Sequence, residues 1–124
     1  MKKTIFTKNA PAAIGPYSQA ILSNNTLYCS GQIGLNKKGE LFAKNIEEET
    51  IQIISNIKAI LNEANMDLTN IVKTTIFLKE MSDFSIVNSI YQKSFNSNPP
   101  ARETVEVSAL PKNVNIEISV IAVI

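Results

Sequence analysis

The chain contains no histidine, no tryptophan, one cysteine and four glycines. Without histidine, the Ser-His-Asp and Cys-His arrangements of nucleophilic catalysis and the common zinc sites are excluded. The single cysteine, Cys29, excludes an intramolecular disulfide. Because no base lies near it in the sequence, we expect Cys29 to be a small buried apolar residue rather than a nucleophile.

An excess of either charge is also missing, because 12 basic residues balance 11 acidic ones for a net charge of +1. No basic block exceeds Lys2-Lys3 or Lys37-Lys38, so binding to nucleic acid is not favoured. The N-terminus lacks an apolar run of signal-peptide length, and no stretch is long enough to span a membrane. With 44% apolar residues, the 124 residues predict one globular domain, 1–124, which we expect to be soluble and cytoplasmic without a membrane partner.

Arginine occurs only once, at Arg102, and every other basic residue is a lysine. Arg102 follows Pro99 and Pro100 and precedes a segment with the pattern of a strand. Its planar guanidinium can bind a carboxylate or phosphate through two hydrogen bonds at once, which a lysine cannot do. Arg102 is therefore a candidate anion clamp. A solvated surface arginine or a structural ion pair is the alternative interpretation.

Glu117 is the only charged residue in the apolar segment 115–124. A half-buried carboxylate tends to have a raised pKa, which suits general acid-base catalysis near neutral pH. A glutamate at the solvent edge or one paired with a lysine is the alternative, since structural ion pairs also perturb pKa values. A carboxylate and a guanidinium together could position an anionic substrate and handle a water molecule, without covalent catalysis.

Residue patterns predict six strands and two helices. Asn24 and Asn25 form an expected hairpin turn, because asparagine tolerates a positive φ. The predicted strands span 4–7, 18–23, 26–30, 71–79, 101–110 and 115–124, and the predicted helices span 45–65 and 82–95.

The first predicted helix carries its own start signal. Asn45 is the expected N-cap, and Glu48 three residues later gives the capping-box pattern. We interpret Glu47, Glu48 and Glu49 as capping and solvated residues that complement the helix dipole, not as a metal cluster. In the second helix, an apolar stripe is expected to pack in the core; it comprises Phe84, Val87, Tyr91 and Phe95.

The segment Asn9 to Pro16 is expected to be a loop, because two prolines and a glycine preclude regular structure. A loop this apolar must lie on something, so we expect it to pack at a surface cleft. Tyr17 could line that pocket or fix the loop onto the core. Ser30 could offer a hydroxyl to a cleft or close a turn.

The last predicted strand is apolar on both faces near its end, whereas two helices can cover only one face of a sheet. Because the chain offers no third layer, a second copy of the protein is the economical cover for the other face. The sequence thus predicts an oligomer whose sheets pack together, with any cleft near the subunit boundary.

Several segments, in this order and at this spacing, resemble one known family, the reactive intermediate deaminase A family (RidA, also called YjgF). The resemblance extends over essentially the whole chain. The segments are Ala-Ile-Gly-Pro-Tyr-Ser-Gln-Ala at 13–20, Tyr-Cys-Ser-Gly-Gln-Ile at 28–33, Val-Lys-Thr-Thr-Ile-Phe-Leu at 72–78, Pro-Ala-Arg-Glu-Thr-Val-Glu-Val at 100–107 and Ile-Glu-Ile at 116–118.

This resemblance implies an α+β, chorismate-mutase-like fold, in which a mixed sheet carries two helices on one face. It implies a homotrimer with a central sheet barrel and three clefts between subunits. The implied activity is that of an enamine/imine deaminase, a 2-iminobutanoate/2-iminopropanoate deaminase that hydrolyses intermediates from 2-aminocrotonate and 2-aminoacrylate to 2-keto acids and ammonia. No metal or organic cofactor is implied.

The resemblance also implies roles for individual residues. Arg102 would clamp the substrate carboxylate, and Glu117 would hold and polarise the attacking water. Close relatives often have cysteine at the position of Thr104 and glutamate at the position of Ser119. Without that second glutamate, the resemblance does not imply a network of paired carboxylates. The positions that would shape the substrate pocket are Tyr17, Ser30, Gly31, Asn88 and Thr104.

A second class of function stays open, a non-catalytic binding or regulatory module that captures small 2-keto acids in the same cleft. Arg102 would serve either function, whereas Glu117 would matter mainly to the deaminase. A third possibility, a ribonuclease, is disfavoured by the near-neutral charge and the absence of histidine.

Overall fold

A computed structural model describes the whole chain, residues 1–124. Two helices and six strands make up the fold, with short 3-10 turns between some of them. In chain order the elements are β1 (Lys2–Ile5), β2 (Ala20–Ser23), β3 (Thr26–Gln32), α1 (Ile46–Glu63), η1 (Leu68–Asn70), β4 (Ile71–Leu78), η2 (Met81–Asp83), α2 (Phe84–Ser94), β5 (Ala101–Glu106), η3 (Pro111–Asn113) and β6 (Ile116–Val123).

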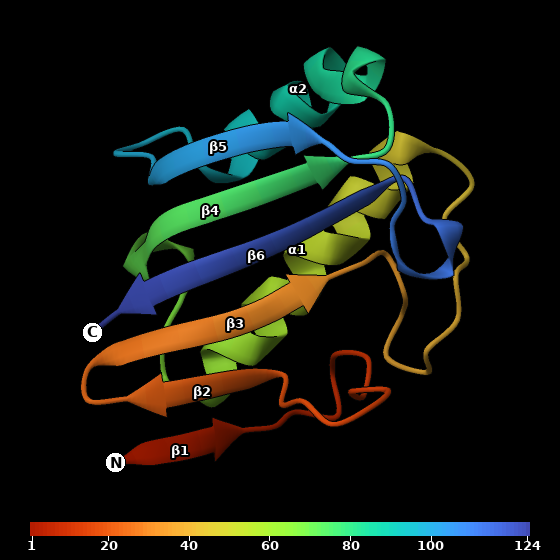
Figure 1. The fold of residues 1–124 in the computed structure, drawn as a ribbon. Helices are drawn as coiled ribbons and strands as arrows, with labels where there is room; N and C mark the ends of the chain where they lie inside the picture. The colour runs from red at the N-terminus through yellow and green to blue at the C-terminus, as the bar shows by residue number, and fades with distance from the viewer.

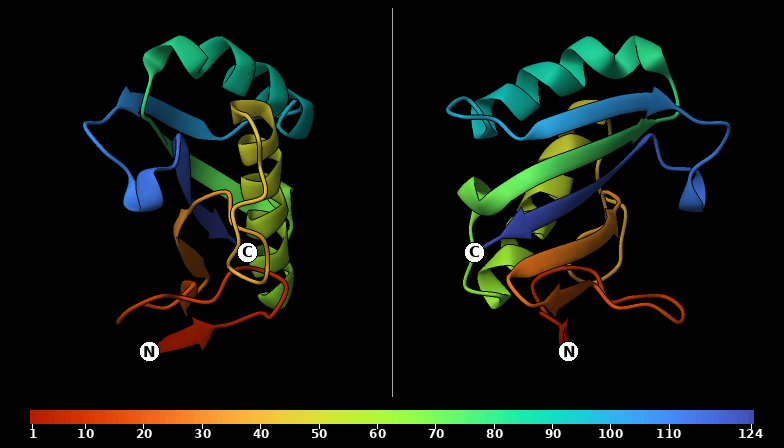
Figure 2. Two further views of the ribbon diagram at one scale, coloured as in Figure 1. Left: turned by 90° about the vertical axis from the view of Figure 1, so that its right-hand side faces the viewer. Right: turned by 60° about the vertical axis from the view of Figure 1, so that its left-hand side comes forward.

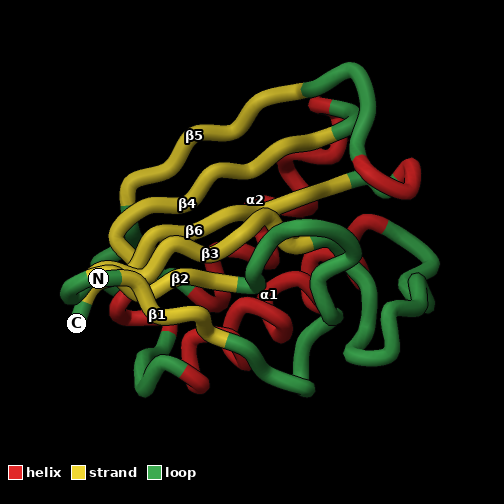
Figure 3. The backbone as a smooth tube through the Cα atoms, turned by 60° about the horizontal axis from the view of Figure 1, so that its bottom comes forward, coloured by secondary structure: helices red, strands yellow, loops and turns green.

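The six strands form one sheet in the order β1-β2-β3-β6-β4-β5, as Figures 1 and 3 show. The last strand, β6, lies in the interior of the sheet and pairs antiparallel with both β3 and β4. Only β4 and β5 run parallel, and α2 connects them, as a parallel pair requires. The predicted mixed sheet of an α+β fold is therefore confirmed.

Both helices lie on the same side of the sheet, which Figure 2 shows in two views. The buried core lies between the sheet and the helices. On β6 every second residue is buried against the helices, and these residues are Ile116, Ile118, Val120 and Ala122. Neither helix is long and apolar enough to cross a membrane.

No helix of the chain covers the other side of the sheet, which is called the open face below. Glu117 and Ser119 lie on it, because they alternate with the buried residues of β6. Apolar side chains lie on the open face as well, and Tyr28 and Val105 are 51% and 41% exposed. Ile121, which is paired with Tyr28, and Phe77, which is paired with Glu117, are also only partly buried.

Four strands differ from the predicted bounds by two residues or more: β1, β2, which starts at Ala20 instead of Ser18, β3, which ends at Gln32 instead of Ser30, and β5. The predicted strand 101–110 stops at Glu106, because its partner β4 ends at Leu78 and only the N–H of Val107 still donates to the carbonyl of Leu78. The predicted strand 4–7 is shifted to Lys2–Ile5, since the backbone of Thr7 bonds to the side chain of Gln19 instead of a strand.

The start of α1 is confirmed in part. The side chain of Asn45 accepts a hydrogen bond from the N–H of Glu48, as a capping residue should. The carboxylate of Glu48 bonds to the N–H of Lys44 rather than to that of Asn45. The expectation that Glu49 is solvated is wrong: Glu49 is 3% exposed and bonds to Asn115.

Candidate active site in two halves

The first group of predicted site residues surrounds a cavity of about 480 Å³ at one end of β3 and β6. We call this the Glu117 half-site. Part of its wall is the loop before Tyr17, so the expectation that this apolar loop packs at a cleft is confirmed. Of the predicted site residues, the lining includes Tyr17, Ser30, Gly31 and Glu117.

Glu117 is half-buried in this cavity, and burial raises the pKa of its carboxyl group above the ordinary value. No lysine pairs with it, because the one ion pair within the chain joins Lys73 and Glu103. The alternative interpretation of a lysine-paired glutamate is therefore wrong. The carboxylate packs directly on the backbone of Gly31, where an added Cβ would lie 2.8 Å from its carboxyl carbon.

The remaining residues of this half-site hold the loop in place. The hydroxyl of Ser30 donates to the carbonyl of Ser18 at 2.6 Å, so it ties the loop to β3. Gln19, which is 3% exposed, bonds through its amide to the backbone of Thr7, Ala10 and Pro11. The side chain of Tyr17 is 53% exposed and lines the cavity, and its hydroxyl accepts a long hydrogen bond, 3.3 Å, from the N–H of Ile14.

The second group surrounds a separate cavity of about 380 Å³ beside α2, which we call the Arg102 half-site. Arg102 is the second residue of β5, at the start of a strand as predicted. The prolines that precede it belong to the wall of the same cavity. The lining consists of Asn88, Tyr91, Gln92, Phe95, Pro99, Pro100 and Arg102.

Arg102 is fixed by an amide and two aromatic rings of α2. One guanidinium N–H donates to the side-chain oxygen of Asn88 at 2.9 Å. The guanidinium carbon lies 4.8 Å from the ring centroid of Tyr91 and 5.5 Å from that of Phe84. A guanidinium carries five N–H donors, so most of its donors stay free for an anion. The alternative interpretation of Arg102 as a structural ion pair is wrong, since no carboxylate pairs with it.

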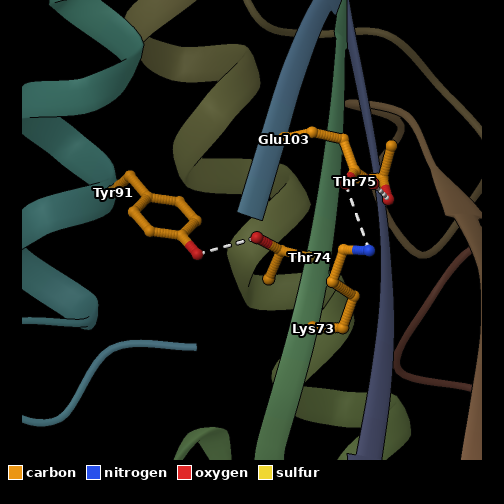
Figure 4. Close-up of polar contacts among 5 residues, drawn as sticks. All are labelled: Lys73, Thr74, Thr75, Tyr91 and Glu103. Atoms are coloured by element: carbon orange, nitrogen blue, oxygen red, sulfur yellow. Dashed lines mark hydrogen bonds and ion pairs between the residues drawn. The ribbon is translucent and has the colours of Figure 1, made fainter. Parts of the chain in front are cut away.

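Tyr91 is in turn held by β4, because its hydroxyl shares a 2.8 Å hydrogen bond with the hydroxyl of Thr74. Figure 4 shows this contact on one side of β4, with Lys73, Thr75 and Glu103 grouped on the other. In that second group, Glu103 accepts from Thr75 and pairs with Lys73 at 3.1 Å, and the Thr75 hydrogen bond and Lys73 lower the pKa of Glu103.

The two halves lie on opposite faces of the sheet. Arg102 is paired with Thr74, whose side chain meets α2, so Arg102 points to the helix side. Glu117 is paired with Phe77, three residues further along β4, and therefore points to the open face. One chain thus does not bring the two predicted catalytic residues together.

Thr104, the remaining predicted site residue, belongs to neither cavity. It follows Arg102 on the helix side of β5 and is paired with Ile76, which is fully buried. Its hydroxyl is buried without any hydrogen-bond partner in the chain. Most buried hydroxyls have such a partner, so Thr104 is an exception among the buried polar groups of this chain.

Sequence reasoning missed the aromatic support of Arg102. Tyr91 was predicted to be a core residue, which is correct, but its ring also contacts the guanidinium of Arg102. The contact between Phe84 and Arg102 was not predicted. A signal was present, because Phe84, Asn88 and Tyr91 share one helix face and a lone amide interrupts that apolar stripe. Cys29 is buried as predicted, and burial raises the pKa of its thiol to about 12.

Comparison with known proteins gives matches over nearly the whole chain. The family described as Endoribonuclease L-PSP matches residues 7–124. The human 2-iminobutanoate/2-iminopropanoate deaminase is 47% identical over 99% of this chain and 90% of its own. A Lactococcus lactis protein named AldR is 54% identical over 97% of this chain and 96% of its own. The crystal structure of the YjgF gene product from E. coli has a TM-score of 0.93 at 46% identity and covers 98% of both chains.

Proposed function

This chain belongs to the Endoribonuclease L-PSP family, the YjgF or RidA family of the resemblance, and from that membership and its two half-sites we propose that it is an imine deaminase. Its substrates would be small 2-imino acids and their enamine tautomers, such as 2-iminobutanoate and 2-iminopropanoate. The observation that carries the proposal is the guanidinium of Arg102, held in place with most of its donors free.

The chemistry needs little beyond positioning. Arg102 would bind the substrate carboxylate through two parallel N–H bonds and so fix the imine carbon. Glu117 would accept a proton from a water whose oxygen bonds to that carbon, and the proton would pass to the imine nitrogen. The product of this step is a carbinolamine. Its hydroxyl proton then moves to the same nitrogen as the carbon–oxygen double bond forms and the carbon–nitrogen bond breaks, so ammonia leaves and the 2-keto acid remains.

The separation of the half-sites supports an oligomeric active site. Arg102 and Glu117 can contact one substrate only if they come from different copies of the chain, because they point to opposite faces of one sheet. The uncovered open face supplies a surface for such packing, with Tyr28 and Val105 exposed on it. We infer a homotrimer in which the open faces form a central barrel and three clefts join the two half-sites.

The binding-module alternative uses the same arginine but not the carboxylate. Nothing in the Arg102 half-site distinguishes a bound 2-keto acid from a 2-imino acid, since both carry the same carboxylate. An unpaired, half-buried Glu117 with a raised pKa is unnecessary for binding an anion and unfavourable next to one. This observation favours the deaminase over the binding module. The charge and missing histidine still give a ribonuclease no support.

A coupled assay tests the proposal. A pyridoxal-phosphate-dependent threonine dehydratase releases the imine, and the release of 2-keto acid is followed with and without this protein. We expect the wild type to accelerate the last step and both Arg102→Ala and Glu117→Gln to lose that effect. A binding module would instead leave the rate unchanged, and it would bind 2-ketobutanoate in calorimetry with only Arg102→Ala impaired.

A further inference from the structure

Glu49 is a buried carboxylate that the proposed chemistry does not use. It lies in the first turn of α1 and is 3% exposed, although no lysine or arginine pairs with it. The position at the helix N-terminus favours its negative charge. A buried group of this kind needs a structural or functional reason, because burying a carboxylate without hydrogen bonds costs free energy.

Its hydrogen bonds lead to the start of β6. One carboxylate oxygen accepts from the backbone N–H of Asn115 at 3.0 Å, and the other accepts from the side-chain amide of the same residue. The carbonyl of Asn115 accepts from the N–H of Lys79 at 3.0 Å. Asn115 is thus fixed from two sides, two residues before Glu117.

The same glutamate also packs against Gly34, which lies in the segment whose residues Gly31, Gln32, Ile33 and Leu35 line the Glu117 half-site. A Cβ at Gly34 would lie 3.2 Å from the Cα and 3.3 Å from the Cγ of Glu49. Three residues earlier in this segment, Gly31 packs on the carboxylate of Glu117 in the same close manner. The segment from Gly31 to Gly34 is therefore in contact with both glutamates.

A second polar residue of α1 holds the same segment. The amide of Asn56, which is 1% exposed, donates to the carbonyl of Leu35 at 2.9 Å and to that of Ile33 at 3.3 Å. These bonds fix the position of this segment relative to α1, and Glu49 connects α1 to Asn115 at the start of β6.

We infer that Glu49 is a positioning residue for the Glu117 half-site: it sets the distance between the carboxylate of Glu117 and the wall at Gly31. The inference rests on the proposed function, since it assigns to Glu49 the alignment of the group that activates water. Gly31 packs against the carboxylate of Glu117, so a shift of β6 changes where that carboxylate lies relative to the wall of the cavity.

Three variants of Glu49 separate positioning from charge. Glu49→Ala removes both hydrogen bonds to Asn115 and should lower kcat by roughly 10- to 100-fold with KM changed by less than about twofold. Glu49→Gln keeps an acceptor for the N–H of Asn115 and should stay within about threefold of wild type. If Glu49→Ala does not fold, Glu49→Asp replaces it, because its side chain is one methylene too short to reach Asn115 and the same loss of kcat is expected.

The matched control is Ile60→Ala, a fully buried core change on the same helix outside both half-sites. It should lower the melting temperature at least as much as Glu49→Ala without a comparable loss of kcat. An equal loss of kcat in the two variants would show that Glu49 acts through stability alone and would overturn the inference.

A second readout does not depend on catalysis. Carbon-13 labelling of the glutamate carboxyls, with Glu117→Gln for assignment, gives the titration midpoint of Glu117 by NMR. Loosening of β6 admits water, so Glu49→Ala should lower that midpoint relative to Glu49→Gln, which removes the same charge. Tyr17 and Lys112, the other titratable groups lining this cavity, are unchanged in both variants. An identical midpoint in the two variants would overturn the inference even if the wild type hydrolysed no imine.

Discussion

The guanidinium of Arg102 is stacked near Tyr91, bonded to Asn88 and otherwise free. This arrangement fixes the orientation of the planar guanidinium group as well as the position of its charge. Arg102→Lys keeps the charge but loses the second parallel hydrogen bond, so we expect kcat/KM for the imine to fall roughly 10- to 100-fold. The coupled dehydratase assay measures the loss. A lysine variant within about twofold of wild type would mean that charge alone suffices.

The titration of Glu117 gives a second prediction for a single residue. Burial raises its pKa, and the ionised form is the one that accepts a proton from water. The acid limb of kcat/KM should therefore lie above pH about 4.3, the ordinary value for a glutamate. A pH–rate profile measures it, and a limb at or below about 4.3 would contradict a role for this carboxylate as the base.

The same shift predicts that Glu117→Gln is more stable than wild type at neutral pH. The pKa of Glu117 is higher in the folded than in the unfolded chain, so protonation of this carboxyl stabilises the fold. The stabilisation is complete below the pKa of the unfolded chain and is lost as the pH rises through the pKa of the folded chain. Glutamine keeps the neutral form at every pH. The gain at pH 7 should stay below about 1.4 kcal/mol, because the side chain is half exposed, and should vanish near pH 3. Thermal unfolding at both pH values tests this, and an equal melting temperature at pH 7 would contradict it.

At the scale of elements, the pairing of β3 with β6 brings Gly31 against the carboxylate of Glu117. The register between the two strands shifts between Cys29 and Gln32, and Gly31 lies in that irregular stretch. Gly31→Ala would place a Cβ against the flexible end of Glu117, so we expect activity to fall about 100-fold while the free energy of unfolding changes by less than about 0.5 kcal/mol.

Gly34→Ala is the matched comparison for Gly31→Ala. Its Cβ would meet the backbone of Glu49 rather than a movable carboxylate, so it should destabilise the fold by about 1–3 kcal/mol. Urea unfolding separates the two variants. If Gly31→Ala lost as much stability as Gly34→Ala, the Glu117 contact would be a packing contact and not a site contact.

The elements were predictable to the extent that their signals are local. Caps such as Asn45 lie within a few residues of the helix they start, and both helices begin and end within two residues of the predicted bounds. The end of β5 was missed because it depends on where β4 stops, far away in the sequence. Glu49 was missed for the same reason: its partner Asn115 is 66 positions further along the chain.

For the candidate site too, the features with a local sequence signal were predictable and those that depend on distant segments were not. Arg102 and Glu117 stand out by composition and pattern, because one is the only arginine and the other the only charge in its segment. Their placement on opposite faces of the sheet depends on the pairings of β4 with β5 and with β6, which involve three distant segments. The aromatic support of Arg102 likewise requires the docking of α2 on β5.

At the scale of the whole molecule, the proposed trimer accounts for both the open face and the division of the site into two halves. The free edge of β5 and the apolar open face are surfaces that a stable monomer would normally protect. If the site is shared between copies, two inactive variants can restore activity in a mixed trimer, whereas a site within one chain does not allow this.

Mixing two inactive variants tests it. Each site of the proposed trimer takes Arg102 from one copy and Glu117 from its neighbour, so a mixed trimer of Arg102→Ala and Glu117→Gln subunits contains some sites with both residues intact. If equal amounts are unfolded together and reassembled at random, roughly one quarter of the sites are complete, and about a quarter of wild-type activity should return. The control is the same mixture without reassembly, which should stay inactive. Failure to regain activity, despite mixed trimers detected by mass spectrometry, would show that each chain carries its own complete site, against the geometry of β5 and β6.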